Sequence, residues 1–214
     1  MIASAATRRS WHGVAELVLA GPQYRRTGTI RLRVTPGGFA TTRSPDLRVV
    51  GAEVVGPATR IPIDGRTCAE LGEALGVDAG APADLYRDGS GVRLDERLVL
   101  DPDAVEILAG AFATGAGALA TFAPQQTPVL WPEHFDVAIT TNEVNYGVSP
   151  GDAYLDEPYA YVGPWHERSG PFWNAPFGAA RPLRELAGVD AVVEFFTEGR
   201  RLASATAPAH ESGR

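Results

Sequence analysis

His134 and Asp136 are separated by one residue, and this spacing is the one in the sequence that best suits acid–base catalysis or metal binding. If residues 134–140 form a β-strand, alternate side chains share a face, so these two lie roughly 6.5–7 Å apart along the strand. Asp136 can then orient the imidazole of His134 for general acid–base catalysis. The other face of the strand is apolar and is expected to face the core: Phe135, Val137 and Ile139.

The same two side chains could instead bind a metal ion, because imidazole and carboxylate are both common metal ligands. Further carboxylates would come from the segment that follows: Glu143, Asp152, Asp156 and Glu157. One nearby histidine, His166, could supply a second nitrogen ligand. The third interpretation is that the pair are ordinary surface residues on the solvent side of a half-buried strand. This last interpretation is favoured, so no metal site is expected and the cofactor is left unknown.

Aromatic side chains are concentrated between positions 131 and 173, although they make up only 8% of the chain. Small-molecule pockets are mostly apolar with a few polar orienting groups, so this composition predicts a ligand pocket formed by residues 131–174. The alternative is that the rings fill a core. The residues expected to bind the ligand are Trp131, Asn142, Tyr146, Tyr159, Tyr161, Trp165, His166, Trp173 and Asn174.

The segment 140–158 is expected to be a long loop, too long for a tight hairpin. It contains two successive sequences typical of turns, at 145–147 and 149–152. Long loops in compact domains often bind ligands, so this segment is a second reason to expect a site here.

The elements that must position these residues point to an α+β fold: a largely antiparallel β-sheet with about three main α-helices packed against it. Alternating apolar and polar residues around the turn at 36–38 predict two strands within 27–43. Further strands are expected at 14–21, 46–56, 59–64, 134–140 and 158–165, with two short extended pieces within 84–100. Alternation along 158–165 places Tyr159 and Tyr161 on one face of that strand.

Three helices are indicated by capping residues and apolar periodicity. Thr67 and Glu70 have the spacing of a capping box for a helix over 68–75. Asp101 and Pro102 predict the start of a second helix, over 102–122, in which Gly115 and Gly117 indicate a bend or a close packing contact. The third helix is expected at 189–204.

The domain organisation follows from these elements. Residues 1–13 are expected to be a flexible N-terminus and residues 204–214 a disordered tail. Residues 14–203 are expected to form a single α+β domain. An alternative division has two packed β-rich halves, 14–100 and 123–203, joined by the helix over 102–122.

Composition limits the possible partners. The net charge is −7 and all 19 basic residues are arginine, so the chain has no basic footprint for nucleic acid and no lysine nucleophile. Cys68 is the only cysteine, which excludes an intrachain disulfide. No apolar run approaches the ~18 residues of a membrane span, and a cytoplasmic location is expected. Sequence motifs for nucleotide binding, zinc proteolysis and serine hydrolysis are absent.

Short segments in a fixed order resemble a family of uncharacterised bacterial proteins, a domain of unknown function. The matching segments are "TGTIRLRVTP", "GFATTRSP", "FDVAIT", "PYAYVGPW" and "GPFWNAPFGAARPL" followed by "DAVVEFFTEG". The family tends to have a histidine several residues before its Phe-Asp pair, where this chain has Val129; here His134 directly precedes Phe135. The resemblance implies a shared fold over most of residues 14–202 and implies no reaction.

Three functional hypotheses remain from these observations, and whether the protein is an enzyme is left open. The first is a protein that binds a small molecule in the aromatic pocket. The second is a cofactor-independent or metal-dependent lyase, isomerase or hydrolase that uses His134 and Asp136. The third is a self-associating structural module, for which a homodimer is expected.

Overall fold

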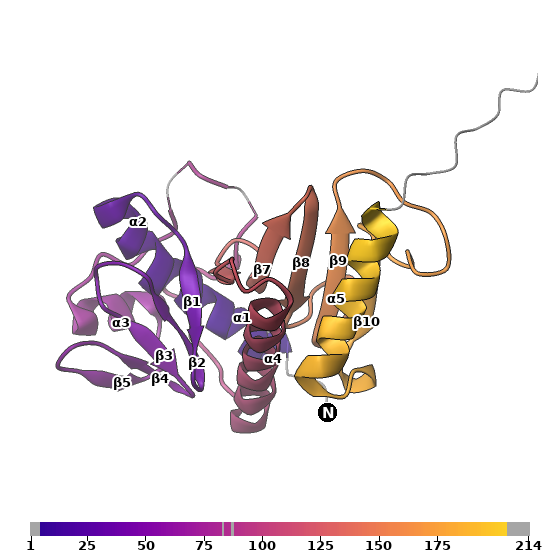
Figure 1. Cartoon of the computed structure of the whole chain (residues 1–214). Coiled ribbons are helices and arrows are strands. Elements are labelled where there is room, and N and C mark those ends of the chain that lie inside the picture. The colour runs from indigo at the N-terminus through magenta and orange to yellow at the C-terminus, as the bar shows by residue number, and fades with distance from the viewer. Residues whose placement is uncertain (1–4, 83, 87, 205–214) are drawn as a thin grey trace, which may run out of the picture.

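The computed structural model describes residues 5–82, 84–86 and 88–204, and its strands form one ten-stranded antiparallel sheet. Figure 1 shows α-helices packed on this sheet, so the expected α+β class is confirmed. The strand order is β10-β9-β8-β7-β6-β1-β2-β3-β4-β5. The strands are β1 (Leu32–Thr35), β2 (Gly38–Thr41), β3 (Arg48–Val50), β4 (Glu53–Val55), β5 (Arg60–Pro62), β6 (Val129–Trp131), β7 (Asp136–Thr141), β8 (Val144–Ser149), β9 (Tyr159–Pro164) and β10 (Ala179–Pro182).

Two helices cover one face of the C-terminal strands. α4 (Pro102–Phe122) contacts β7 and β8, and α5 (Gly188–Ser204) contacts α4, β8 and β9. In Figure 1 both helices lie in front of these strands. α4 begins where the sequence predicts, because the Asp101 side chain accepts a hydrogen bond from the backbone N–H of Ala104 and Pro102 occupies the first turn.

At Gly115, α4 lies close to the sheet. A Cβ atom added at Gly115 would lie 2.7 Å from side-chain atoms of Val137 on β7 and Val148 on β8. The predicted close packing contact is therefore confirmed, and it explains why a glycine interrupts this helix.

A smaller helix, α3 (Cys68–Leu75), follows the N-terminal strands in the chain and contacts the N-terminal helical segment described below. Its predicted capping box is present: the Glu70 backbone N–H donates to the Thr67 hydroxyl, and the Thr67 backbone N–H donates to the Glu70 carboxylate. Cys68 is fully buried, and burial raises the pKa of its thiol to about 12. A cysteine in this state is unreactive near neutral pH.

The expectation of a flexible N-terminus is wrong for residues 5–13, and residues 1–4 lie outside the described residues. Residues 5–27 form α1 (Ala5–Gly13), a π-helical segment η1 (Val14–Ala20) and α2 (Gly21–Thr27), so the strand predicted at 14–21 is also wrong. All of η1 is buried, and Trp11 packs edge-on against Phe39. A short apolar run buried on every side has no periodicity that separates strand from helix.

The expected loop over 140–158 is instead a tight hairpin for half its length. Asn142 and Glu143 both have left-handed backbones, with φ of 51° and 61°, and connect β7 directly to β8. Two consecutive left-handed residues are the signature of a two-residue hairpin turn whose twist matches the strands. The predicted turn at 145–147 lies inside β8, whereas the bend predicted at 149–152 follows that strand.

Three other segments differ from the sequence predictions. β6 (Val129–Trp131) and β10 (Ala179–Pro182) lie outside all the strands predicted from the sequence. The described residues of 84–100 contain turns and one isolated bridge between Arg97 and Thr67, but no strand. Ser204, the first residue of the predicted disordered tail, is the last residue of α5, and residues 205–214 lie outside the described residues.

Among the described residues, one helix, α4, is long and apolar enough to cross a membrane by length and composition alone. The sequence-based statement that no segment approaches such a span is therefore wrong. The buried residues of α4 face the sheet and α5, however, and a core helix of a soluble protein passes the same test.

Candidate functional site

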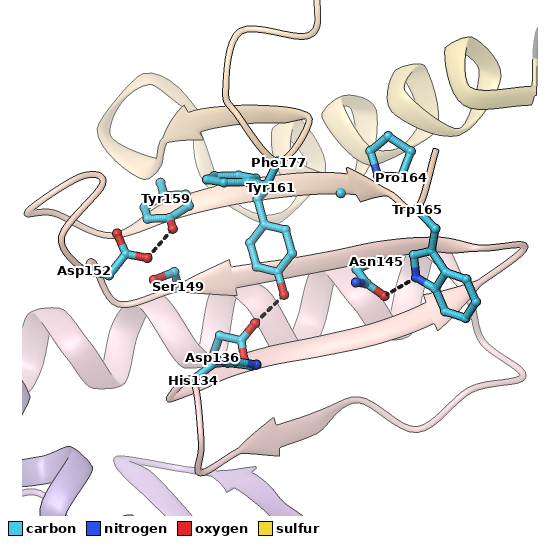
Figure 2. A pocket seen from close by; sticks show the side chains of 11 residues that line it. His134, Asp136, Asn145, Ser149, Asp152, Tyr159, Tyr161, Pro164, Trp165 and Phe177 are labelled. Carbon is cyan, nitrogen blue, oxygen red and sulfur yellow. Dashed lines mark hydrogen bonds between the residues drawn. The ribbon is translucent and has the colours of Figure 1, made fainter. Parts of the chain in front are cut away.

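A cavity of about 600 Å³ opens on the face of β7, β8 and β9 that points away from α4 and α5. Figure 2 shows this cavity from close by, with the helices behind the strands. We call it the open-face pocket. It is lined by His134, Asp136, Asn145, Ser149, Asp152, Tyr159, Tyr161, Gly163, Pro164, Trp165 and Phe177.

Strand register explains which side chains reach the pocket. Ala138 pairs with Gly147, and Gly147 pairs with Tyr161, so these three residues share one face across β7, β8 and β9. Gly147 is essential to this arrangement, because a Cβ atom there would lie 2.5 Å from the hydroxyl oxygen of Tyr161. The missing side chain lets the Tyr161 ring cross β8 and reach Asp136 on β7 (Figure 2).

Asp136 and Tyr161 form the polar floor of the pocket. The Tyr161 hydroxyl donates a short hydrogen bond to Oδ2 of Asp136. The other carboxylate oxygen, Oδ1, is buried and has no hydrogen-bond partner among the described residues. Asp136 is only 6% exposed, and this burial raises the pKa of its carboxyl to about 6, although the Tyr161 hydrogen bond acts in the opposite direction. Burial and the adjacent Asp136 carboxylate raise the pKa of Tyr161 well above its usual value.

A second carboxylate–phenol pair lies beside the first. The Tyr159 hydroxyl donates a 2.6 Å hydrogen bond to Oδ2 of Asp152. Oδ1 of Asp152 accepts from the backbone N–H groups of Tyr154 and Leu155, which fixes this carboxylate at the bend after β8. Burial, followed by the hydrogen bond to Asp152, raises the pKa of Tyr159. The two tyrosines share a strand face as predicted, with ring centroids 6.4 Å apart.

Aromatic rings form the rim of the pocket. The Phe177 ring lies 6.3 Å from that of Tyr159 and 6.2 Å from that of Tyr161, measured between centroids. At the opposite end Trp165 is 62% exposed, and its indole N–H donates a 3.4 Å hydrogen bond to the Asn145 side-chain oxygen. The rim therefore combines packed rings with one exposed indole.

His134 does not form the predicted pair with Asp136. β7 begins only at Asp136, because Phe135 has a left-handed φ of 54° and breaks the alternation before the strand starts. The His134 side chain is 70% exposed, lies at the rim of the pocket and has its nearest acidic partner in Glu133, at 3.6 Å. Asp136 instead has Tyr161 as its partner. The predicted inward direction of Phe135, Val137 and Ile139 is confirmed, since all three are buried.

Three of the expected ligand-binding residues line the open-face pocket, namely Tyr159, Tyr161 and Trp165. Trp131 pairs with Asp136 across the sheet and so faces the same side, but its ring lies under the guanidinium of Arg31, outside the pocket lining.

The other expected ligand-binding residues lie elsewhere. Tyr146 points to the helix side, where it is 1% exposed and contacts Phe122. Asn142 and His166 line a separate cavity of about 90 Å³ together with Tyr146.

Trp173 and Asn174 belong to the loop before β10, and Trp173 lines a further cavity of about 520 Å³ with Trp165 and His166. Asn174 exchanges two hydrogen bonds with the backbone of Ala180, and the Trp173 ring packs edge-on against Phe172. Neither residue is part of the open-face pocket lining.

Sequence reasoning did not select four side chains of the pocket: Asn145, Ser149, Pro164 and Phe177. A signal for the first two was present, since Val144, Tyr146 and Val148 alternate with them. An apolar alternation of this kind marks a strand and would have placed Asn145 and Ser149 on the opposite face from the core.

The metal-ligand alternative finds no support in the geometry. No group of three histidine, cysteine, aspartate or glutamate side chains within the described residues could hold an ion. Two of the proposed ligands have other partners, because Asp156 pairs with Arg8 and Glu157 pairs with Arg184.

Comparison of the chain with protein-family models, curated proteins and solved structures returns no match. The resemblance to an uncharacterised bacterial family, the cytoplasmic location and the homodimer therefore stay predictions. The function has to be argued from the pocket itself.

Proposed function

We propose that this protein binds a small organic molecule in the open-face pocket. The observation that carries the proposal is Oδ1 of Asp136, a buried carboxylate oxygen without a hydrogen-bond partner among the described residues, at the floor of an aromatic-walled cavity. Buried polar atoms nearly always have partners, because leaving one unpaired costs free energy. A bound ligand that donates a hydrogen bond would supply the partner after a neighbouring side chain moves, because Oδ1 itself has almost no exposed surface.

The dimensions and chemistry of the cavity support the same proposal. A volume of about 600 Å³ lies within the range of pockets that hold small molecules. Four of its eleven lining residues are tyrosine, tryptophan or phenylalanine. Two of its polar side chains are held by neighbours: Asp152 by two backbone N–H groups, Asn145 by the Thr140 hydroxyl. Such preorganised groups orient a ligand at a low cost in conformational entropy.

A fragment screen observed by two-dimensional NMR tests this proposal. The screen includes compounds of several charge types. We expect the compounds that bind to shift the Trp165 indole signal and the backbone amide signals of β8 and β9. The variant Gly163→Leu should abolish these shifts, because Gly163 lines the pocket and an added Cβ meets nothing closer than 3.4 Å, so the side chain fills the cavity without disturbing the strand.

The matched control is Gly110→Leu, the same substitution on α4, where an added Cβ meets nothing within 4 Å. It should leave every shift in place. A screen in which no compound perturbs the pocket, or in which Gly163→Leu responds like the parent, would contradict the proposal.

A second candidate is an enzyme that uses Asp136 as a general acid or base. It is favoured by the carboxyl pKa of about 6, because proton transfer is most efficient when the pKa of the group lies near the working pH. In this case Tyr161, rather than His134, would position the carboxyl. The two candidates are separated by recovering a compound after prolonged incubation: an unchanged compound supports a binding protein, and conversion that Asp136→Asn abolishes supports an enzyme.

A further inference from the structure

The charged groups of the open-face pocket are mainly acidic. Asp136 and Asp152 line its interior, and no arginine is among the described residues that line it, although arginine is the only strongly basic residue type in the chain. The one imidazole, that of His134, lies at the rim and is largely exposed to solvent. A carboxylate or phosphate ligand would therefore meet two like charges without a strong counter-charge.

The two oxygens of Asp136 differ in a way that selects the kind of partner. Oδ2 accepts from the Tyr161 hydroxyl, and Oδ1 is buried without a partner among the described residues. An ionised carboxylate can only accept hydrogen bonds, so the missing partner has to be a donor. A positively charged donor gives the strongest such bond, and it also offsets the cost of burying the carboxylate.

The aromatic wall favours the same class of ligand. The rings of Tyr159, Tyr161 and Phe177 lie at nearly equal centroid distances from one another, 6.4, 6.3 and 6.2 Å. Aromatic ring faces attract cations and also bury the apolar part of an organic amine. Tyr161 extends from this wall to the Asp136 carboxylate, as Figure 2 shows.

We infer that the open-face pocket selects an organic cation: a protonated amine that donates to Oδ1 of Asp136 and places its apolar group against Tyr159, Tyr161 and Phe177. This inference rests on the proposed function and narrows it to a ligand class. The ammonium would complete the hydrogen bonding of a carboxylate that the fold leaves half paired, and the neighbouring Asp152 would add attraction for the positive charge.

Three probes of similar shape and different charge test the inference: phenethylammonium, 2-phenylethanol and 3-phenylpropionate. Each is titrated into the full chain at pH 7.5, and binding is followed through the Trp165 indole signal and the β8 and β9 amides. We expect phenethylammonium to bind at least about tenfold tighter than 2-phenylethanol, the effect of one charge-assisted hydrogen bond, and 3-phenylpropionate to bind weakest.

Asp136→Asn should remove the preference, so that the ammonium and the alcohol bind within about twofold of each other. Glu106→Gln is the matched control, because it removes one exposed negative charge from α4 on the other side of the sheet and should keep the preference. The titration of the parent protein decides the question by itself if Asp136→Asn fails to fold.

The outcomes separate the ligand class from the existence of a ligand site. Binding of the alcohol or the propionate in the pocket as tightly as the ammonium overturns the inference and leaves the proposed function standing. Absence of any shift with phenethylammonium at about 10 mM also overturns the inference. The proposed function is then decided separately, by the broader screen with Gly163→Leu.

Discussion

The two faces of β7, β8 and β9 are both aromatic, but only one of them is closed. On the helix side, Tyr146 packs against Phe122 and Phe196 with centroids 4.7 and 5.8 Å away, and all three rings are buried. On the other side, Tyr159, Tyr161 and Phe177 stand around a cavity of about 600 Å³. Aromatic composition therefore does not distinguish a core from a pocket. The difference lies in what covers each face.

The polar groups divide between the two faces in the same way. Asp136, Asn145 and Asp152 all belong to the open face, and each has at least one defined hydrogen-bond partner. The helix face of β7 and β8 presents valine and isoleucine to α4. Mutations on the two faces should therefore have opposite signatures: loss of stability on the helix face, and a change in ionisation or ligand affinity on the open face.

Removing one ring from each face should give the largest contrast. Phe196 is 0% exposed, so Phe196→Ala is expected to reduce the free energy of unfolding by about 3–5 kcal/mol through lost burial and a residual cavity. Phe177 is 36% exposed at the pocket rim, and Phe177→Ala should cost less than about 1 kcal/mol. Urea unfolding of both variants measures the difference. Equal losses would show that the open face is as tightly packed as the core.

The pH dependence of stability should come from the open face. The pKa of Asp136 is about 6 in the folded state, above the usual 3.8, so the folded protein binds more protons than the unfolded chain between these values. The free energy of unfolding should therefore fall as the pH rises from about 4 to about 6, by on the order of 3 kcal/mol for this group, and change little from it above pH 7.

Asp136→Asn isolates this contribution, because the amide cannot ionise and its oxygen can still accept from Tyr161. The slope between pH 4 and pH 6 should become less negative than that of the parent, while Glu106→Gln on α4 should leave it nearly unchanged. Unfolding curves collected at intervals across this range provide the measurement. If Asp136→Asn kept the slope of the parent, folding would not raise the pKa of the Asp136 carboxyl, and the prediction would be wrong.

How far the sequence predicts this molecule depends on whether a signal is local. The capping box at Thr67 and the helix start at Asp101 were predicted, because each depends on residues within one turn. The face shared by Tyr159 and Tyr161 was predicted from strand alternation alone. The N-terminal helix was missed, because the buried run of η1 lacks periodicity.

The candidate site was predicted only in part for the same reason. Asp136 was selected by its type, but its partner was wrongly expected to be the neighbouring His134. The actual partner, Tyr161, is 25 residues away and reaches Asp136 through the register of β8 and β9 and the missing side chain of Gly147. A register across three strands is a tertiary property. The register also depends on the tight turn at Asn142 and Glu143. This turn contains no glycine, the residue that usually marks such a turn in a sequence.

The Asp136–Tyr161 hydrogen bond should contribute most to stability when the carboxyl is charged. Tyr161→Phe removes the phenol partner of Oδ2, so that neither oxygen of Asp136 has a hydrogen-bond partner among the described residues, which should raise the pKa of the carboxyl above about 6. Stability at pH 8 should fall by about 1.5–3 kcal/mol, the worth of a hydrogen bond to a charged group, and by less at pH 5. Tyr154→Phe, at a largely exposed ring, is the control and should change neither value. Carboxyl-carbon NMR of Asp136 in both variants would reveal an unchanged pKa, the result that contradicts this prediction.

The smallest predicted difference in stability is between alanine variants of two glycines, one on α4 at the helix side of the sheet and one in the open-face pocket. At Gly115 an added Cβ would lie 2.7 Å from branched side chains of β7 and β8, so Gly115→Ala should cost about 1 kcal/mol even though alanine favours a helix. At Gly163 the nearest atom to an added Cβ is 3.4 Å away, and Gly163→Ala should change stability by less than about 0.5 kcal/mol.

Thermal and urea unfolding of the two glycine variants, measured together with ligand titration, complete the test. Gly115→Ala should lower stability and leave binding of phenethylammonium unchanged, because its effect is confined to the helix side of the sheet. Gly163→Ala should leave stability unchanged and alter affinity only slightly, since a methyl group occupies little of a 600 Å³ cavity. If Gly115→Ala weakened binding as much as it weakened folding, the two faces would be mechanically coupled through β7 and β8, and the pocket would depend on the packing behind it.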